Sequence, residues 1–276
     1  MRRHHFLSAA LHAFLIAACL IAVAPIFWGL VTSLKENSKI LSYPPQWIPN
    51  PMTLENYNLV LFASSFPRFF FNSAVVAILT ILMTLAIAAH AAYAAARLKY
   101  RGKNVLLFLV LATSMIPGIS VLAPLYLIAV TVGLHNTYLV LVLVYCAWQV
   151  PIVIWLLRGF IETVPTELEE AAMIDGCSRL QAFYRVVLPI LQPGLAASAI
   201  IVFVSVWNDF LIGSALTISE NMRLIQVGLY RYISDIGVEW GRFLAYGMLA
   251  LLPIMVVFLI LQKRFISGLT AGAVKG

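Results

Sequence analysis

The chain has 276 residues, of which 62% are hydrophobic and only 11% are charged, and its mean hydropathy is +0.96. A soluble domain carries about 25% charged residues, so this composition excludes an ordinary soluble protein and indicates a membrane protein. The net charge of +7 does not indicate nucleic-acid binding, because the basic residues flank apolar runs instead of forming one patch.

Six apolar runs are long enough to cross the hydrocarbon core of a membrane, which takes about 20 residues of helix. They cover residues 11–34, 71–96, 105–130, 138–157, 186–211 and 243–261. The first run could instead be a signal peptide, because Arg2 and Arg3 precede it and Ala22-Val23-Ala24 resembles a cleavage site. However, it continues through Leu34, which is long for a signal peptide and favours an uncleaved membrane helix.

The lysines and arginines are distributed unevenly between the two sides that six crossings define. Twelve of the 18 fall on the side that receives both termini, and the turn "RLKYRGK" after the second run carries four of them. The positive-inside rule places this side in the cytoplasm. We therefore expect a multi-pass membrane protein with both termini cytoplasmic, including a tail over residues 263–276.

The densest polar segment, residues 167–184, lies between the fourth and fifth runs on the predicted cytoplasmic side. It holds four of the eleven acidic residues. Thr166 and Glu169 match the T-x-x-E capping box, and Gly176 is a natural stop, so a short helix is predicted between them. The helix is too short to span. From periodicity alone, a docking element for a cytoplasmic partner and a solvated loop helix are equally supported.

A second helix is predicted to follow directly. Ser178 and Gln181 match an S-x-x-Q capping box, and the helix that they open runs into the membrane. Pro189 and Pro193 should kink or break it, because proline lacks the N–H that a helix interior needs.

Several polar or helix-breaking residues lie in or near the apolar runs. Asn208 and Asp209 could line a cavity, or Asp209 could lie at the membrane interface beside Trp207. Further candidates are Trp148 and Gln149, whose aromatic face and amide suit a hydroxylated ring, and Pro117, which with Pro124 and Gly118 should break the third run. His90 lies on a stripe of small residues, where packing against a partner helix is favoured over a proton relay.

Part of the polar segment matches a known signature. Glu170, Ala171, Ala172, Gly176, Leu188 and Pro189 stand at the positions of the EAA motif of binding-protein-dependent ABC importer permeases, with Val186 where Ile is usual. Other stretches resemble the carbohydrate subfamily, and specifically the MalG-like subunit of maltose-type systems: "PPQWIPNPMTLENY", "AAYAAARLKYRGK", "VPTELEEAAMIDG", "WNDF" and "GLTAGAVKG". The resemblance covers nearly the whole chain.

The resemblance implies an all-α fold, a type I ABC importer permease with six transmembrane helices in a single domain over residues 1–276. It implies that segment 165–189 forms the cytoplasmic coupling region, with the coupling residues Glu170, Ala171, Ala172, Asp175, Gly176, Leu188 and Pro189. The candidates for the translocation pathway remain Asn208, Asp209, Trp148, Gln149 and Pro117. The implied substrate is a di- or oligosaccharide, or a related sugar or polyol, and the sequence does not identify which one.

The resemblance also implies partners. These are a homologous second permease that completes a heterodimer, two ATP-binding subunits and an extracytoplasmic solute-binding protein, which the outer loops at 35–68 and 214–242 should meet. No G-x-x-x-x-G-K-[ST] loop occurs in the chain, so ATP and Mg are expected on the ATPase partner and no cofactor on this chain. We therefore expect a transport subunit and not an enzyme.

The sequence gives less support to a disulfide or metal site and to another class of transporter. The three cysteines lie far apart without a CxxC pair, so neither a disulfide framework nor a metal site is predicted. An ion-gradient-driven secondary transporter or channel subunit is the alternative function. It would be expected to carry intramembrane acidic or histidine relays and internal repeats, whereas the predicted spans contain almost no carboxylates.

Overall fold

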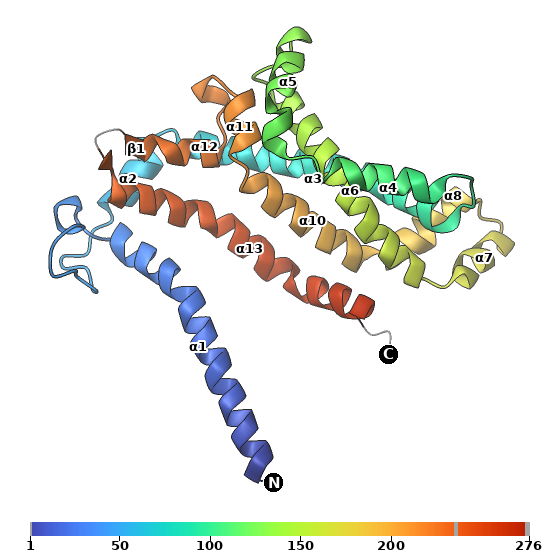
Figure 1. The fold of residues 1–276 in the computed structure, drawn as a ribbon, viewed down its shortest axis with the longest axis horizontal. Coiled ribbons are helices and arrows are strands. Elements are labelled where there is room, and N and C mark those ends of the chain that lie inside the picture. Colours follow the sequence, from blue (N-terminus) through green and yellow to red (C-terminus); the bar gives the residue numbers. More distant parts are fainter. Residues whose placement is uncertain (1, 235–236, 274–276) are drawn as a thin grey trace. The chain divides into compact units, whose positions relative to one another are not determined.

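The computed structural model describes residues 2–234 and 237–273, and helices dominate this part of the chain (Figure 1). Four helices are long and apolar enough to cross a membrane. Two pairs of shorter helices meet the same criteria when each pair is taken together, although each is sharply bent at a short break. The predicted all-α membrane fold is therefore confirmed, with four spans, or up to six if each bent pair crosses as one.

The chain divides into two compact units, residues 1–67 with 228–252 and residues 68–227 with 253–276. The first unit contains α1 (Arg2–Ser33), η1 (Asn37–Lys39), α2 (Glu55–Phe62), η4 (Tyr230–Tyr232), and the antiparallel strands β1 (Ile233–Ser234) and β2 (Gly237–Val238). Ile233 is paired with Val238 in this hairpin. The long helices α3 (Phe66–Arg97) and α13 (Trp240–Ala273) each belong partly to both units.

The segment predicted as the first outer loop is held in place by Asn56 of α2. Its amide nitrogen donates to the carbonyls of Ser33 and Lys35, both at 3.0 Å. The ammonium group of Lys35 lies 4.4 Å from the centre of the Trp28 ring, a cation–π contact, and burial lowers the pKa of this lysine. The loop is therefore folded structure and not a plain connection between spans.

The second unit contains most of the remaining helices. They are α4 (Lys103–Thr113), α5 (Gly118–Thr131), α6 (Tyr138–Thr163), α7 (Thr166–Ile174), α8 (Arg179–Ala182), the π-helical turn η2 (Phe183–Val187), α9 (Leu188–Ile190), α10 (Gln192–Trp207), α11 (Leu211–Leu216), η3 (Glu220–Met222) and the start of α12 (Ile225–Leu229). Within this unit, α7 lies at one end of α6, and α5 and α11 lie near the other end (Figure 1).

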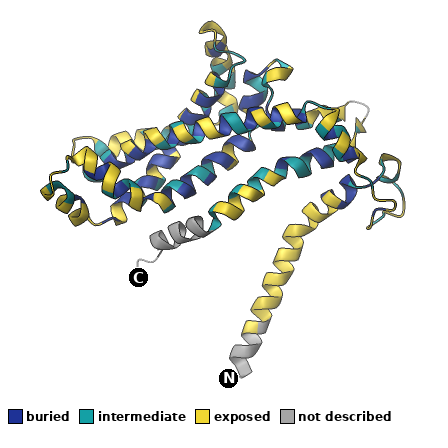
Figure 2. Cartoon of the chain, turned by 180° about the vertical axis from the view of Figure 1, so that it is seen from behind, coloured by how far each residue is buried: buried dark blue, intermediate teal, exposed yellow. Residues whose placement is uncertain are grey.

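The core of the second unit lies between α6 and α10, which carry buried residues along the faces where they meet (Figure 2). On α6, Val153, Leu157 and Ile161 are completely buried. On α10, a Cβ added to Gly194 would come within 2.8 Å of the Phe160 ring, so glycine is needed for this close approach. Close packing of this kind makes α6 and α10 a rigid frame for the sites that they carry.

The structure bends the chain at two of the places predicted from prolines. Helices α4 and α5 meet at 87°, with Pro117 directly before α5. The α8–α9 segment and α10 meet at 73°, and Pro189 and Pro193 stand in the first turns of α9 and α10, where no N–H is needed. The prediction is wrong for Pro124, which lies inside α5 without ending it.

Two predicted boundaries differ from the structure. The second outer loop, residues 214–242, contains short helices and the β1–β2 hairpin among its described residues. Helix α13 continues to Ala273, so the tail predicted at 263–276 begins inside a helix, and its residues 274–276 lie outside the described part of the chain. The sequence missed both because short elements and helix extensions add little to a hydropathy pattern.

Candidate functional site

The first candidate site is built on α7, which ends in a complete Schellman motif. The N–H of Gly176 donates to the carbonyl of Met173 at 3.1 Å, and the N–H of Cys177 donates to the carbonyl of Ala172 at 3.0 Å. Gly176 has a φ of +92°, a conformation that side chains with a Cβ rarely adopt. The predicted helix stop at Gly176 is therefore confirmed.

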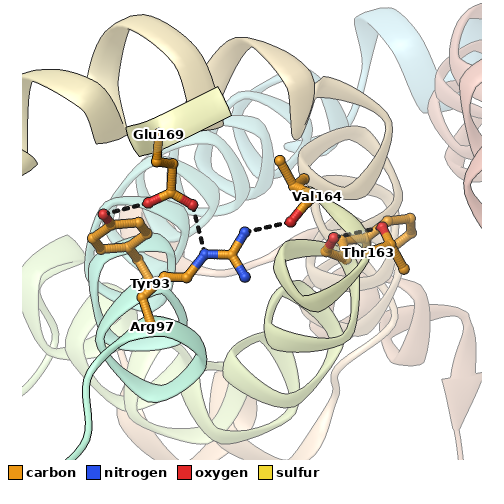
Figure 3. Close-up of polar contacts among 6 residues, drawn as sticks. Tyr93, Arg97, Thr163, Val164 and Glu169 are labelled. Carbon is orange, nitrogen blue, oxygen red and sulfur yellow. Dashed lines mark hydrogen bonds and ion pairs between the residues drawn. The ribbon is translucent and has the colours of Figure 1, made fainter. Parts of the chain in front are cut away.

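The predicted capping box at the start of α7 is wrong. No side chain caps this end of the helix, and the carboxylate of Glu169 is directed to α3 instead (Figure 3). Glu169 Oε2 accepts a hydrogen bond from the Tyr93 hydroxyl at 2.7 Å, and Oε1 accepts one from Arg97 Nε at 2.5 Å. The other end of the Arg97 guanidinium donates to the carbonyl of Val164 at 2.6 Å, just after α6.

We refer to Tyr93, Arg97 and Glu169 as the Glu169 cluster. The side chains of Arg97 and Glu169 are only 9% and 7% exposed, so their charges are largely removed from solvent and compensate one another. Tyr93 and Arg97 are four residues apart and therefore share one face of α3. The cluster ties α7 to the last turn of α3 and to the end of α6.

The opposite face of α7 is exposed and combines acidic with apolar side chains. Ile174 is 87% exposed and Leu168 is 45% exposed. The predicted coupling residues Glu170, Ala171, Asp175 and Gly176 are exposed as well, whereas Ala172 is half-buried. An exposed helix face with apolar residues between acids is suited to contact another protein.

A pocket of about 520 Å³ adjoins this helix. Its lining comes from the last residue of α3 and the two residues after it, from α7, and from the first residue of α8. The lining residues are Arg97, Leu98, Lys99, Thr166, Glu169, Glu170, Met173 and Arg179. Glu170 therefore borders a recess that also holds basic groups, while Glu169 forms part of its wall. The two adjacent glutamates have different roles: Glu169 holds the helix in place, and Glu170 is available at the surface.

The segment after α7 connects it to α10. The predicted capping box at Ser178 and Gln181 is confirmed, with the Ser178 N–H donating to Gln181 Oε1 at 2.8 Å and the Gln181 N–H donating to Ser178 Oγ at 3.3 Å. The predicted coupling residues Leu188 and Pro189 lie in α9, which contacts η2 and α10. They belong to the bend and not to the exposed face of α7.

The second candidate site is a pocket of about 380 Å³ lined by residues of α5, α6, α10 and α11 and of the segment before α11. It is lined by Gly118, Tyr145, Trp148, Gln149, Ser205, Asn208, Asp209, Leu211 and Ile212. Four of the five residues predicted for the pathway, Trp148, Gln149, Asn208 and Asp209, thus border one pocket. The fifth, Pro117, is next to Gly118, which lines it.

Asp209 has a structural function in this pocket. Its Oδ1 accepts hydrogen bonds from the Tyr145 hydroxyl at 2.8 Å and from the N–H groups of Ile212 and Gly213 at 2.9 and 3.2 Å. The carboxylate therefore caps α11 and joins it to α6. Its neighbour Trp207 is 1% exposed, so this side chain packs inside the protein.

Gln149 differs from Asp209 because its polar atoms are not all paired. The residue is 8% exposed, and Oε1 is buried without a hydrogen-bond partner among the described residues. The Trp148 ring lies beside it in the chain and close to Gly118, where an added Cβ would come within 3.5 Å of the ring. Gln149 thus has a buried, unpaired acceptor and is next to an aromatic residue that lines the pocket.

Two further predictions from the sequence concern His90 and the absence of a metal site. His90 contacts the Tyr184 hydroxyl and the Ala86 carbonyl, each at 2.6 Å, and its ring packs against Phe183 and Tyr184. Among the residues whose side chains the structure describes, no group of three or more His, Cys, Asp or Glu residues could hold a metal ion. Sequence reasoning missed the Glu169 cluster, although the four-residue spacing of Tyr93 and Arg97 at the end of an apolar run was a signal for it.

The fold is that of type I ABC importer permeases. Over 96% of this chain and 98% of the other, with a TM-score of 0.81 and 22% identity, it matches a chain in the crystal structure of a bacterial ABC transporter involved in the import of the acidic polysaccharide alginate. Together with the spans, this similarity defines a multi-pass membrane protein with this fold.

Comparisons of sequence identify the family. The chain is 35% identical to the sulfoquinovosyl glycerol transport system permease protein SmoH of Agrobacterium fabrum, over 91% of this chain and 88% of that protein. It is 34% identical to the trehalose/maltose transport system permease protein MalG of Thermococcus litoralis, over 95% and 94%. Residues 85–270 match the family described as binding-protein-dependent transport system inner membrane component, and the chain belongs to this family.

Proposed function

We propose that the chain is the permease subunit of an ATP-driven importer that carries a carbohydrate across the inner membrane. The observation that carries this proposal is α7, a short helix that exposes acidic and apolar side chains while the buried Glu169 fixes it to α3. A helix that is firmly attached on one face and open on the other is suited to receive a movement from a partner.

The partner at α7 is an ATPase subunit, which holds ATP and Mg while this chain holds neither. Glu170, Ala171 and Asp175 contact it, because they are exposed on the free face of the helix. Closure of two ATPase subunits displaces α7, and the displacement reaches α3 through the Glu169 cluster and α10 through α8, η2 and α9. Packed helices respond as rigid bodies with discrete arrangements, which makes alternating access possible.

The remaining partners follow from the family and from the exposed apolar surface. A homologous permease completes the translocation pathway as a heterodimer. A solute-binding protein delivers the substrate on the extracytoplasmic side, and the words "binding-protein-dependent" in the family's description support this partner. Helix α1 is exposed along nearly all of its apolar span (Figure 2) and is in contact with lipid or with the second permease. Both termini are cytoplasmic by the distribution of basic residues.

The substrate class is carbohydrate, which the similar proteins named above support. Their names refer to sulfoquinovosyl glycerol, to trehalose and maltose, and to alginate, so they include both neutral and acidic sugars. The pocket on α6 and α10 is lined by amide, hydroxyl and aromatic groups that suit sugar hydroxyls and apolar ring faces.

The test is uptake by the reconstituted complex. The chain is purified with its second permease and ATPase subunits, inserted into proteoliposomes and supplied with the solute-binding protein, and uptake of radiolabelled trehalose, maltose and sulfoquinovosyl glycerol is followed. We expect uptake of at least one sugar that requires ATP and the binding protein and is insensitive to a protonophore. Uptake that follows an ion gradient without ATP would instead identify a secondary transporter.

A further inference from the structure

The loop between α1 and α2 carries large apolar side chains that the chain itself leaves uncovered (Figure 1). Its residues 40–54, "ILSYPPQWIPNPMTL", include no charged residue. Tyr43 is 96% exposed, Ile48 79% and Trp47 68%. A contiguous exposed apolar patch marks a place of contact with a protein, a ligand or a membrane, so this loop requires a partner.

The loop is tied to the end of α1 at its base. The N–H of Thr53 donates to the Leu34 carbonyl at 2.9 Å, and Lys39 Nζ donates to the Asn50 carbonyl at 3.3 Å. These two hydrogen bonds bring the chain back to the helix that it has just left. The apolar residues of the loop are therefore kept close to α1.

The contact between Trp47 and α1 gives the depth of the loop. The Trp47 ring packs edge-to-face on Trp28, with the ring centres 5.1 Å apart. Trp28 lies inside the apolar span of α1, Ala10–Ser33, five residues before its end, which is about 7.5 Å along a helix axis. Trp47 therefore lies beside the last part of the span and not beyond it.

The composition of the loop suits the boundary between hydrocarbon and headgroups. Trp and Tyr concentrate at this boundary because each combines an apolar ring with one polar group. Four of the nine residues from Tyr43 to Pro51 are prolines, which have no N–H, so this backbone has fewer donors to satisfy where water is scarce. Position and composition thus indicate the same partner, which is lipid.

We propose that the tip of this loop, residues 41–48, lies in the interface of the lipid bilayer on the side where α1 ends, the predicted outer side. The exposed apolar surface of the α1 span then continues across Trp28 and Trp47 onto the loop. The proposal assigns the tip to phospholipid, whereas the resemblance to carbohydrate permeases implies contact of the outer loops with a solute-binding protein. A tip held in the interface anchors the outer end of α1.

The first test measures which medium surrounds the tip when the assembled complex is in proteoliposomes. In a background carrying Cys19→Ser, Cys146→Ala and Cys177→Ser, a nitroxide label is attached to Ile48→Cys and, as the control in water, to Ser234→Cys in the exposed hairpin. Electron paramagnetic resonance then measures collisions of the label with O2, which concentrates in lipid, and with a water-soluble nickel complex. We expect the ratio of O2 to nickel collisions at position 48 to be at least about fivefold that at position 234.

Three outcomes of this test would overturn the proposal. Equal ratios at positions 48 and 234 would place the tip in water. Slow collision of the label at position 48 with both reagents would show that the second permease covers it. A loss of O2 collisions when the solute-binding protein is added would assign the tip to that protein instead.

The second test uses the native side chains without a label. Tryptophan fluorescence is compared between the wild-type complex and Trp47→Phe in phospholipids brominated on the upper part of the acyl chains, and the emission lost in the variant belongs to Trp47. We expect bromine to quench this part by at least about half, because the ring lies at interfacial depth. Trp207→Phe is the control, since Trp207 is buried and its emission should be quenched less.

Unquenched emission from Trp47 would also overturn the proposal. Neither test requires uptake or ATP hydrolysis, so a failure of the lipid contact leaves the proposed function standing. Conversely, a complex that transports no carbohydrate can still show the tip in the lipid interface.

Discussion

Arg97 of α3 and Glu169 of α7 form a buried ion pair in which Nε and Oε1 are 2.5 Å apart. A charge left without its partner in such a place costs about 3–5 kcal/mol. We expect Glu169→Ala to lower the free energy of unfolding by this amount, measured by denaturant unfolding of the purified complex. This measurement tests whether the pair keeps α7 attached to α3.

A matched control is available on the neighbouring helix. Arg158 and Glu162 form an exposed i,i+4 pair at 2.8 Å, and Glu162→Ala should cost about 0.5 kcal/mol or less. The double exchange Arg97→Glu with Glu169→Arg should recover part of the lost stability. Equal effects of Glu169→Ala and Glu162→Ala would show that the buried pair does not hold α7.

The second prediction concerns the turn that ends α7. Gly176 has a φ of +92° and open space around its Cα, so a side chain there meets backbone strain and no neighbouring atom. Gly176→Ala should lower the free energy of unfolding by about 1–2 kcal/mol, and the β-branched Gly176→Val should lower it by more. The measurement is binding-protein-stimulated ATP hydrolysis together with thermal stability.

Gly159→Ala is the control for this change, because Gly159 lies inside α6 with equally open space but ordinary helical backbone. It should be neutral or stabilise the protein by about 0.5–1 kcal/mol. If Gly176→Val behaves like Gly159→Ala in both measurements, the positive φ at Gly176 is not required for coupling.

The third prediction concerns the exposed face of α7. Glu170→Lys reverses a charge that makes no ion pair or hydrogen bond with other described residues, so the fold should be unaffected. Co-purification of the ATPase subunit should fall at least about tenfold, since a like-charge contact at an interface is costly. Glu162→Lys, also at an exposed glutamate, should retain the ATPase. Normal stoichiometry in Glu170→Lys would place the ATPase elsewhere.

The fourth prediction concerns topology. A reporter fused after Lys103 should be cytoplasmic and one fused after His135 should be external, because basic residues are concentrated before α4 and absent from residues 131–137. The two sites lie on either side of the α4–α5 bent pair. Reporters on the same side would show that this pair enters and leaves the membrane without crossing it.

The fifth prediction concerns Asp209 as the cap of α11. Asp209→Asn keeps Oδ1 and should be tolerated, whereas Asp209→Ala removes the acceptor of three hydrogen bonds and should cost about 1–3 kcal/mol. Thermal unfolding of the purified complex distinguishes the two variants. If Asp209→Asn lowered thermal stability more than Asp209→Ala, a capping role for Asp209 would be contradicted.

The parts of the fold that the sequence predicted correctly depend on local chemistry. The stop at Gly176, the capping box at Ser178 and Gln181, and the bend before Pro117 are each determined by a few neighbouring residues. The spans follow from long apolar runs, because few other structures can accommodate them. These features needed no knowledge of tertiary contacts.

The errors arose where a distant residue competed with a local motif. Glu169 satisfies the capping-box pattern, but Arg97 and Tyr93, more than 70 positions away, provide stronger partners for its carboxylate. Nothing local distinguishes the buried Glu169 from the exposed Glu170. Likewise, the sequence suggested Gln149 and Asp209 as separate candidates, and only the packing of α6 against α10 brings them to one pocket.

The two irregular points between α8 and α10 determine how stiffly α7 is joined to the membrane helices. The π-helical turn η2 and the 73° bend follow one another within a few residues, so a rotation of α8 can be absorbed there by small changes in backbone angles. The connection to α3 is a short buried ion pair, which has no comparable irregular backbone. We therefore expect a displacement of α7 to reach α3 with less loss of amplitude than it reaches α10.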